Sequence, residues 1–324
     1  MIRAFLLLLL SATFAFLPAC AYKQEEVSFR SADVELSGTL YLPAGKGPHP
    51  GIAFLHGSGP DSREQYRFYG ELFAKRGIAA LVYDKRGVGT STGDWTRSPF
   101  AALADDAASA VAFLRKHEAI DDDRVGLWGG SEGAIVAPWV ASRGPGVAFL
   151  ILQSATGVTF AEQNLHQTEV QMRQLRLPAS EVNEALHFQR LKHHYARTGD
   201  GWAEYAEALR RSRTEPWSSL GGPAEPDDWW WRWYGTKMDV DPVEIIKKVR
   251  APVFAVWGER DHLIPVRKSR DSLARALTQG GNRDVTLLVV SGADHSLNKP
   301  GGPNPAPEYL DAMLAWLGKR AGLS

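Results

Sequence analysis

The sequence predicts an α/β fold in which helices cover both faces of a mostly parallel sheet. Short, fully apolar runs recur along the chain, as expected for parallel strands that are buried on both faces. Helical periods separate several of these runs. Strands that alternate with helices in this way favour a parallel sheet between two helical layers.

The predicted elements follow in a regular order. Residues 34–42 alternate between apolar and polar side chains, which is typical of a strand, and residues 43–50 form a turn rich in Pro and Gly. The clearest helical periods cover residues 68–76 and 100–117. Further strands are predicted at residues 51–55, 78–83, 125–128, 147–152, 253–257 and 285–290.

The alternation stops within residues 157–245, which we interpret as a helical cap inserted into a core of residues 22–156 and 246–324. The inserted tryptophans either pack the cap on the core or line an apolar pocket. The segment holds six of the eleven tryptophans: Trp202, Trp217, Trp229, Trp230, Trp231 and Trp233. Its three predicted helices cover residues 162–177, 179–197 and 202–213.

Composition excludes several classes of protein. The 324 residues carry 37 Lys+Arg against 37 Asp+Glu, so the formal net charge is zero. General nucleic-acid binders usually carry a basic excess, and we therefore expect no nucleic-acid partner. Hydrophobic residues make up 44% and charged residues 23%, which fits a globular chain. A single cysteine allows neither an intramolecular disulfide nor a cysteine-rich metal site.

Residues 1–20 are predicted to be a signal peptide. Their apolar run, residues 4–17, is shorter than the roughly 20 residues of a membrane-spanning helix. The sequence Leu-Pro-Ala-Cys, ending at Cys20, resembles a bacterial lipobox, so Cys20 would carry a lipid that tethers the protein to a membrane. Cleavage after Ala-Cys-Ala would instead release Tyr22, and an uncleaved anchor is a third possibility. Each predicts export to the cell envelope, the periplasm or the medium.

The main chemical signal is a Gly-x-Ser-x-Gly motif between a predicted strand and a helical pattern. Gly129 and Gly133 flank Ser131 two residues away on either side. A strained strand-to-helix turn brings backbone segments close together there and leaves no room for side chains. The turn would push the Ser131 hydroxyl out above the sheet at a helix N-terminus, which predicts a nucleophile.

A serine nucleophile needs a base, and the base needs an acid to orient it. His295 lies in the loop after the last predicted strand and is the expected base. Asp261 follows the preceding strand and is the expected acid, with Glu259 and Asp294 as adjacent alternatives. Four other histidines lie on the predicted cap, where we expect them to be solvated: His166, His187, His193 and His194.

The tetrahedral oxyanion of acyl transfer needs backbone donors. The N–H of Glu132, directly after the nucleophile, is expected to supply one. The N–H of Ser58, in a His-Gly-Ser-Gly-Pro loop after a predicted strand, is expected to supply the other. Such donors are typically worth about 3 kcal/mol each in the transition state. We interpret His56 in the same loop as structural.

Five segments together carry a resemblance to a known family: residues 56–60, 84–91, 129–133, 258–265 and 292–295. With them the chain resembles the α/β-hydrolase superfamily, in particular its exported esterase and acyl-hydrolase branch related to prolyl-oligopeptidase-like and dienelactone-hydrolase-like proteins. The order Ser131, Asp261, His295 is the nucleophile–acid–histidine order of that superfamily. The resemblance implies a mostly parallel, eight-stranded sheet with helices on both faces and a helical cap. Gly130 stands where lipases often carry His or Tyr, which disfavours a lipase.

Three other patterns could suggest a binding site, but we interpret each of them as structural or solvated. The glycine-rich residues 84–89 lack the order of a phosphate loop, and the resemblance implies a structural turn at the rim of the site. His193 and His194 have no matching third ligand, so we expect no metal and no cofactor. The acidic run of residues 121–123 is interpreted as a solvated turn.

The leading hypothesis is a serine hydrolase that cleaves small carboxylic esters or thioesters through an acyl-enzyme on Ser131. The alternative is a serine peptidase or amidase of the prolyl-oligopeptidase type, although residues 22–50 are too short for the propeller domain of such enzymes. A non-catalytic envelope binding protein is a third hypothesis, which the complete set of catalytic residue types disfavours.

Overall fold

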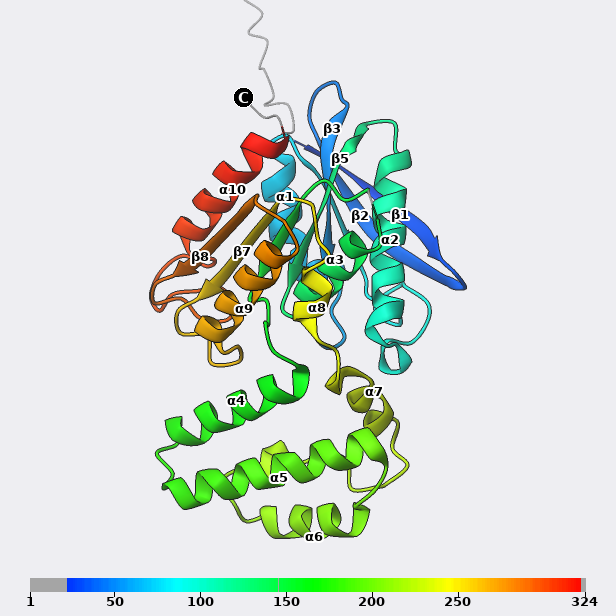
Figure 1. The fold of residues 1–324 in the computed structure, drawn as a ribbon. Helices are drawn as coiled ribbons and strands as arrows, with labels where there is room; N and C mark the ends of the chain where they lie inside the picture. Colours follow the sequence, from blue (N-terminus) through cyan, green and yellow to red (C-terminus); the bar gives the residue numbers. More distant parts are fainter. Residues whose placement is uncertain (1–21, 145, 322–324) are drawn as a thin grey trace, which may run out of the picture.

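The computed structural model describes residues 22–144 and 146–321, so the predicted signal peptide and Cys20 lie outside the described residues. Eight strands form one sheet in the order β1-β2-β4-β3-β5-β6-β7-β8 (Figure 1). Only β1 and β2 run antiparallel to their neighbours, which confirms a mostly parallel, eight-stranded sheet. The strands are β1 (Tyr22–Ser31), β2 (Val34–Pro43), β3 (His49–Leu55), β4 (Ala79–Tyr83), β5 (Ile120–Gly130), β6 (Leu150–Gln153), β7 (Val253–Gly258) and β8 (Val285–Val290).

Helices cover both faces of the sheet, as the sequence predicts. Helices α1 (Arg67–Ala74) and α10 (Pro307–Ala321) pack on one face. The other face carries α2 (Phe100–Lys116), α3 (Gly133–Ser142), α8 (Pro242–Ile246) and α9 (Val266–Gln279). In the parts of the chain that the structure describes, no helix is both long enough and apolar enough to cross a membrane.

The apolar runs of the central strands follow from this double cover. In β3, Ile52 and Phe54 belong to the apolar cluster beneath α1 and α10. Ala53 and Leu55 belong to the cluster beneath α2 and α3. Because successive side chains of a strand point to opposite faces, a strand buried on both sides must be apolar throughout.

Four further helices lie apart from the sheet, between β6 and α8 (Figure 1). The three helices predicted in this segment are confirmed to within a few residues. Their apolar side chains form a separate core that includes Trp217 and Trp231. The helices are α4 (Phe160–Gln174), α5 (Ala179–Thr198), α6 (Trp202–Ser212) and α7 (Trp229–Met238).

The cap tryptophans meet each of the two expectations in part, since Trp229, Trp231 and Trp233 line a cavity of about 570 Å³ that does not include Ser131. Most pack the cap helices against one another and not onto the sheet. Trp229 and Trp233 do reach the rest of the molecule, where their rings meet Trp95 edge-on at centroid distances of 6.2 and 5.7 Å. Large rings therefore give this segment a core of its own.

Two local predictions are wrong. The acidic residues 121–123 lie in strand β5 and not in a turn, because β5 pairs with β3 as early as Ile120 and the register then shifts before Val125. His49, expected in a turn, begins β3 through the same pairing.

Candidate active site

Ser131 occupies the tight turn between β5 and α3. Its φ is +53°, in the left-handed region that a serine rarely adopts. A Cβ on Gly129 would come within 2.2 Å of the Gly133 carbonyl oxygen, and one on Gly133 within 2.6 Å of the Leu55 carbonyl oxygen. Backbone crowding therefore requires both glycines, and it holds Ser131 in its strained conformation.

Asp261 holds the ring of His295. The Asp261 Oδ2 lies 2.7 Å from His295 Nδ1, and the Asp261 side chain is fully buried. Its other oxygen, Oδ1, accepts from the backbone N–H groups of Leu263 at 2.8 Å and Ile264 at 3.1 Å. The carboxylate is thus fixed on both oxygens, and the ring presents Nε2 as its unprotonated nitrogen.

The two adjacent acids serve other partners. Glu259 accepts from the Ser291 hydroxyl at 2.7 Å and from the Gly292 N–H at 2.8 Å, and these bonds lower the pKa of its carboxyl. Asp294 accepts from the N–H groups of Ser296 and Asn298, both at 2.9 Å. Both acids shape the loop that carries His295, and Asp261 is the acid bonded to its ring.

Ser131 and His295 line one cavity of about 390 Å³, which we call the wide cavity. Its floor is aromatic, because the ring of Trp128 packs against that of Tyr69 at a centroid distance of 5.2 Å. Phe68 stands at its edge with 48% of its surface exposed. Ser131 and His295 therefore face a common space with an apolar wall.

A second, narrow cavity of about 20 Å³ lies against Ser131. Ser58 and Glu132 line it, and the cap contributes Phe160 and Gln163 from the start of α4. The other lining residues are Phe100, Ile135, Thr156 and Ile264. In neither cavity beside Ser131 is a cap tryptophan among the lining residues.

The N–H groups of Ser58 and Glu132 are free of protein acceptors within residues 22–144 and 146–321. The neighbouring Gly57 N–H, in contrast, donates to Asp61 Oδ2 at 2.8 Å. Glu132 directly precedes the first residue of α3, so its N–H lies at the positive end of a helix. Two unpaired donors beside the nucleophile suit a developing negative charge.

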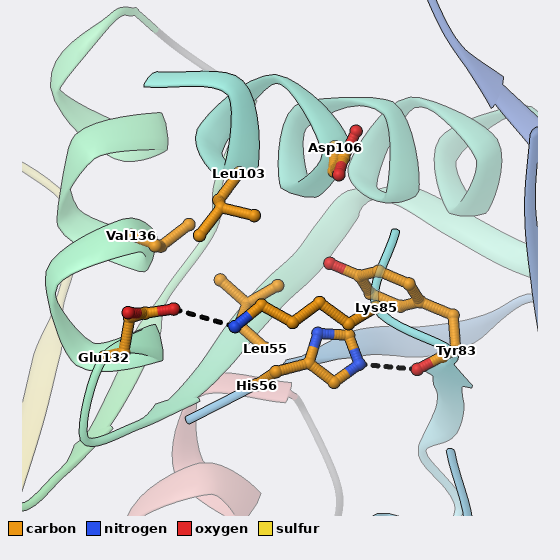
Figure 2. A pocket seen from close by; sticks show the side chains of 8 residues that line it. All are labelled: Leu55, His56, Tyr83, Lys85, Leu103, Asp106, Glu132 and Val136. Atoms are coloured by element: carbon orange, nitrogen blue, oxygen red, sulfur yellow. Dashed lines mark hydrogen bonds and ion pairs between the residues drawn. The ribbon is translucent and has the colours of Figure 1, made fainter. Parts of the chain in front are cut away.

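The side chain of Glu132 forms a buried cluster that sequence reasoning missed. Lys85 Nζ lies 2.8 Å from Glu132 Oε1 (Figure 2), and the cap residue Lys237 pairs with Oε2. The Ser58 hydroxyl donates to the same Oε2 at 3.2 Å. The charged side chains are only 1–3% exposed. We call Ser58, Lys85, Glu132 and Lys237 the Glu132 cluster.

The charges of this cluster are strongly coupled. Burial by itself would raise the pKa of Glu132, but Lys85 and Lys237 outweigh burial and hold that pKa below its ordinary value. Burial lowers the pKa of Lys237, and the Glu132 carboxylate only partly offsets the effect. With one acid between two lysines, the ionised cluster carries a net positive charge. The available sequence signal was weak: Lys237 follows Trp233 by one helical turn, and its ammonium lies 4.3 Å from that ring.

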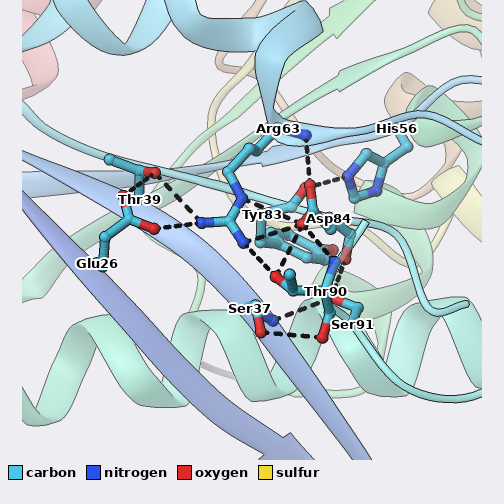
Figure 3. A network of polar contacts seen from close by, with 9 residues as sticks. All are labelled: Glu26, Ser37, Thr39, His56, Arg63, Tyr83, Asp84, Thr90 and Ser91. Carbon is cyan, nitrogen blue, oxygen red and sulfur yellow. Dashed lines mark hydrogen bonds and ion pairs between the residues drawn. The ribbon is translucent and has the colours of Figure 1, made fainter. Parts of the chain in front are cut away.

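The turn after β4 holds the rim of the site. Asp84 accepts from Arg63 at 2.9 Å and from the Thr90 N–H at 3.1 Å, and Arg63 extends to Glu26 on β1 (Figure 3). The Arg86 guanidinium donates two hydrogen bonds, of 2.6 and 2.7 Å, to the Asp106 carboxylate. The glycine-rich segment is therefore occupied by internal contacts, as expected for a structural turn.

His56 lies next to the Lys85 side chain (Figure 2). Its Nε2 is 2.6 Å from the Tyr83 carbonyl oxygen, to which the neutral ring donates. Burial and, to a smaller extent, the ammonium of Lys85 lower the pKa of His56 to about 4. This histidine stays neutral near pH 7 and supports the loop that carries Ser58.

The expectation that the cap histidines are solvated is wrong for His193. Its Nε2 lies 3.1 Å from the Tyr234 hydroxyl oxygen, and burial lowers its pKa to about 3. The cause is helix α7, which the sequence did not predict and which covers this face of α5. His187 and His194 are exposed, and His166 is half-buried.

Within the described ranges, the acidic residues 121–123 are the one group of three or more potential metal-ligand side chains whose atoms lie within 4.8 Å of one another. They stand at the far end of β5 from Ser131 and are largely exposed. Asp121 already pairs with Arg124 at 2.6 Å. An exposed acidic run of this kind gives no reason to assign a metal.

Known proteins resemble this chain to different extents. Esterase EstD of Thermotoga maritima is 25% identical over 294 residues, which cover 87% of this chain and 64% of EstD. Thiohydrolase apmlB of Arthrinium phaeospermum is 35% identical over 130 residues, which cover 39% of this chain and 41% of apmlB. This chain thus spans less than two thirds of either relative.

The solved structure of the Pyrococcus furiosus esterase PF2001 superposes with a TM-score of 0.61 at 18% identity, over 93% of this chain and 92% of that one. This likeness shows the fold. The family model for X-Pro dipeptidyl-peptidases of the S15 family matches residues 32–296, which is most of the chain. The protein is therefore an α/β-hydrolase and belongs to the X-Pro dipeptidyl-peptidase (S15) family.

Proposed function

We propose that the protein is a serine hydrolase that cleaves carboxylic esters or thioesters through an acyl-enzyme on Ser131. One observation carries this proposal: Ser131, in a strained turn, shares a cavity with His295, whose ring is held by the buried carboxylate of Asp261. This arrangement supplies a nucleophile, a base and an orienting acid.

In the proposed reaction, His295 Nε2 takes the hydroxyl proton as Ser131 Oγ attacks the substrate carbonyl. The N–H groups of Ser58 and Glu132 stabilise the oxyanion that forms. When the tetrahedral intermediate collapses, its carbon–oxygen or carbon–sulfur bond breaks and His295 protonates the departing alcohol or thiol. Water then attacks the acyl-enzyme with His295 again as base, and the carboxylic acid is released.

A peptidase or amidase of the prolyl-oligopeptidase type is the second candidate, and the matching family model favours it. The names of the two relatives, an esterase and a thiohydrolase, favour ester and thioester bonds instead. Residues 22–50 also form strands of the core sheet, so they do not provide a separate propeller domain. Turnover of 4-nitrophenyl acetate should be compared with that of dipeptidyl-proline 4-nitroanilides; faster cleavage of the anilides would reverse the choice.

The Ser131→Ala variant tests the nucleophile. We expect it to lose both ester turnover and labelling by a fluorophosphonate probe. Ser296→Ala is the matched control, because Ser296 is exposed and lines the same wide cavity. Equal labelling of wild-type protein and Ser131→Ala would contradict the proposal, and absence of labelling in both would favour a non-catalytic binding protein.

We also propose that the protein is exported and that Cys20, outside the described residues, carries a lipid which tethers it to a membrane. The motif around Cys20 supports this proposal. Mass spectrometry of the mature N-terminus tests it: a diacylglyceryl-modified Cys20 is expected, and an unmodified chain that starts at Tyr22 would contradict it.

A further inference from the structure

The two cavities that meet at Ser131 differ in size and in the residues that line them. The wide cavity, about 390 Å³, is lined by His295. The narrow cavity, about 20 Å³, is lined by Ser58 and Glu132 and not by His295. The acyl chain and the leaving group of an ester lie on different sides of the nucleophile. The difference between the two cavities therefore indicates which of them holds the acyl chain and which holds the leaving group.

The assignment rests on the function proposed above. A tetrahedral carbon bonded to Ser131 carries an oxyanion, a leaving group and an acyl chain. The oxyanion faces the donors of Ser58 and Glu132, and the leaving group must reach His295 to receive its proton. The leaving group therefore occupies the wide cavity, and the acyl chain is left with the narrow one.

With the oxyanion placed at its mouth, between Ser131 and the two N–H donors, the narrow cavity has room for little more than one further water-sized group, such as the methyl of an acetyl group. Ile135 and Ile264 of the core form part of its wall. The cap closes it with Phe160, whose ring is held edge-on by Tyr234 at a centroid distance of 5.4 Å. A longer acyl chain would have to displace packed side chains, which is costly in a close-packed interior.

The wide cavity suits a bulky, apolar leaving group. Phe68 is one of three large hydrophobic side chains that the described residues leave exposed, and it stands beside Tyr69 at a ring distance of 5.4 Å. Together with Trp128 they form an aromatic wall. Flat apolar groups stack favourably on such rings.

We propose that the enzyme acts on short-chain acyl esters, acetyl above all, of bulky aromatic alcohols or thiols. The geometry assigns Phe160 as the residue that limits acyl length and Phe68 as a residue that binds the alcohol portion. The same geometry predicts poor cleavage of X-Pro amides, because their acyl portion contains a proline ring that the narrow cavity does not admit.

Hydrolysis of 2-naphthyl acetate, butyrate and octanoate tests the acyl side. For the wild type, kcat/KM should fall at least about tenfold from acetate to butyrate and further to octanoate. In Phe160→Ala, and less strongly in Phe160→Leu, the ratio of butyrate to acetate should rise about tenfold. An equal or higher rate on octanoate in the wild type, or an unchanged ratio in both folded variants, would overturn the proposal.

Phe68→Ala is the matched control on the other side of Ser131. It should raise KM for 2-naphthyl acetate several-fold and leave both KM for ethyl acetate and the butyrate-to-acetate ratio unchanged. A shift of acyl preference in Phe68→Ala would reverse the assignment of the two cavities. Fluorophosphonate labelling of Ser131 separates failure of this inference from failure of the proposed function. A labelled enzyme that prefers long acyl chains would contradict only the short-chain preference. An enzyme that is not labelled would contradict the serine-hydrolase function as well.

Discussion

Two clusters of charged side chains diverge from the turn after β4. Asp84 joins Arg63 and, through it, Glu26 on β1 (Figure 3). Its neighbour Lys85 joins Glu132 (Figure 2), and Glu132 in turn joins the cap residue Lys237. Two adjacent residues of one turn, Asp84 and Lys85, are thus linked by ion pairs to strand β1 on one side and to the turn that carries Ser131 on the other.

The clusters differ in burial and in the sign of their charge. Arg63 stands between two acids, one of which, Glu26, has 75% of its side chain exposed. Glu132 stands between two lysines, and all three side chains are almost completely buried. Burying charge is costly, and proteins tend to retain such arrangements at functional sites. The Arg63 side therefore joins the N-terminal strands to the turn after β4. From the difference in burial and charge, we expect the Glu132 side to keep a positive charge near the proposed oxyanion.

Glu132→Ala should produce the largest effect, because it leaves two lysines buried without an acid. We expect a loss of about 3–5 kcal/mol in the free energy of unfolding, measured by urea denaturation. Glu26→Ala, which removes the exposed acid of the other cluster, should leave the urea midpoint almost unchanged. Similar midpoints for the two variants would show that burial does not distinguish the clusters.

Lowering the pH should produce the next largest effect, through His56. Its pKa is about 4 in the folded protein, below the value of about 6.5 in an unfolded chain. The unfolded state therefore binds the proton first, so stability is complete above pH 6.5 and falls as the pH drops to about 4. The full loss is about 3 kcal/mol.

Urea midpoints between pH 7 and pH 4 measure this dependence. His56→Gln should make the curve shallower in that interval without flattening it, because buried His193, with a pKa of about 3, adds a dependence of the same sign. His187→Gln, which changes an exposed histidine of the cap, should preserve the slope. An unchanged slope in His56→Gln would assign the acid sensitivity to other groups.

Arg63→Met should destabilise the protein by a smaller amount, about 2 kcal/mol, because it deprives the buried Asp84 of charged hydrogen bonds. We expect kcat of the folded fraction to remain near that of the wild type, since Arg63 contacts neither cavity beside Ser131. Arg67→Met, one helical turn along and exposed, is the control and should not shift the midpoint. A fall in kcat without a fall in stability would place Arg63 in the catalytic apparatus instead.

Burial and local crowding explain which features of the fold and the site could be predicted from the sequence. Runs such as residues 51–55 reveal the sheet, because double burial forces every side chain to be apolar. The strained turn at Ser131 is visible because crowding restricts Gly129 and Gly133. Strand β1 was missed because much of it is exposed and polar. The contact of Glu132 with Lys237 joins residues 105 positions apart, and no local periodicity encodes such a pair.

Lys237→Met should have the smallest effect on stability and the most informative one on catalysis. Methionine keeps an apolar side chain near the rings of Phe100 and Trp233. Glu132 still pairs with Lys85, so the net charge of the ionised cluster falls from positive to zero. Because Lys85 still compensates Glu132, the substitution leaves no buried charge unpaired, and we expect little loss of stability. The loss of positive charge near the oxyanion should lower kcat about tenfold, or about 1.4 kcal/mol.

Lys192→Met is the control for this last variant. Lys192 is also a buried cap lysine near aromatic rings, but its ammonium donates to the Leu220 carbonyl at 2.6 Å, whereas that of Lys237 pairs with Glu132. Stopped-flow acylation with a fixed ester should slow in Lys237→Met and not in Lys192→Met. Equal acylation rates in both variants would show that the Glu132 cluster only fastens the cap, and the contrast between the two clusters would then be one of burial alone.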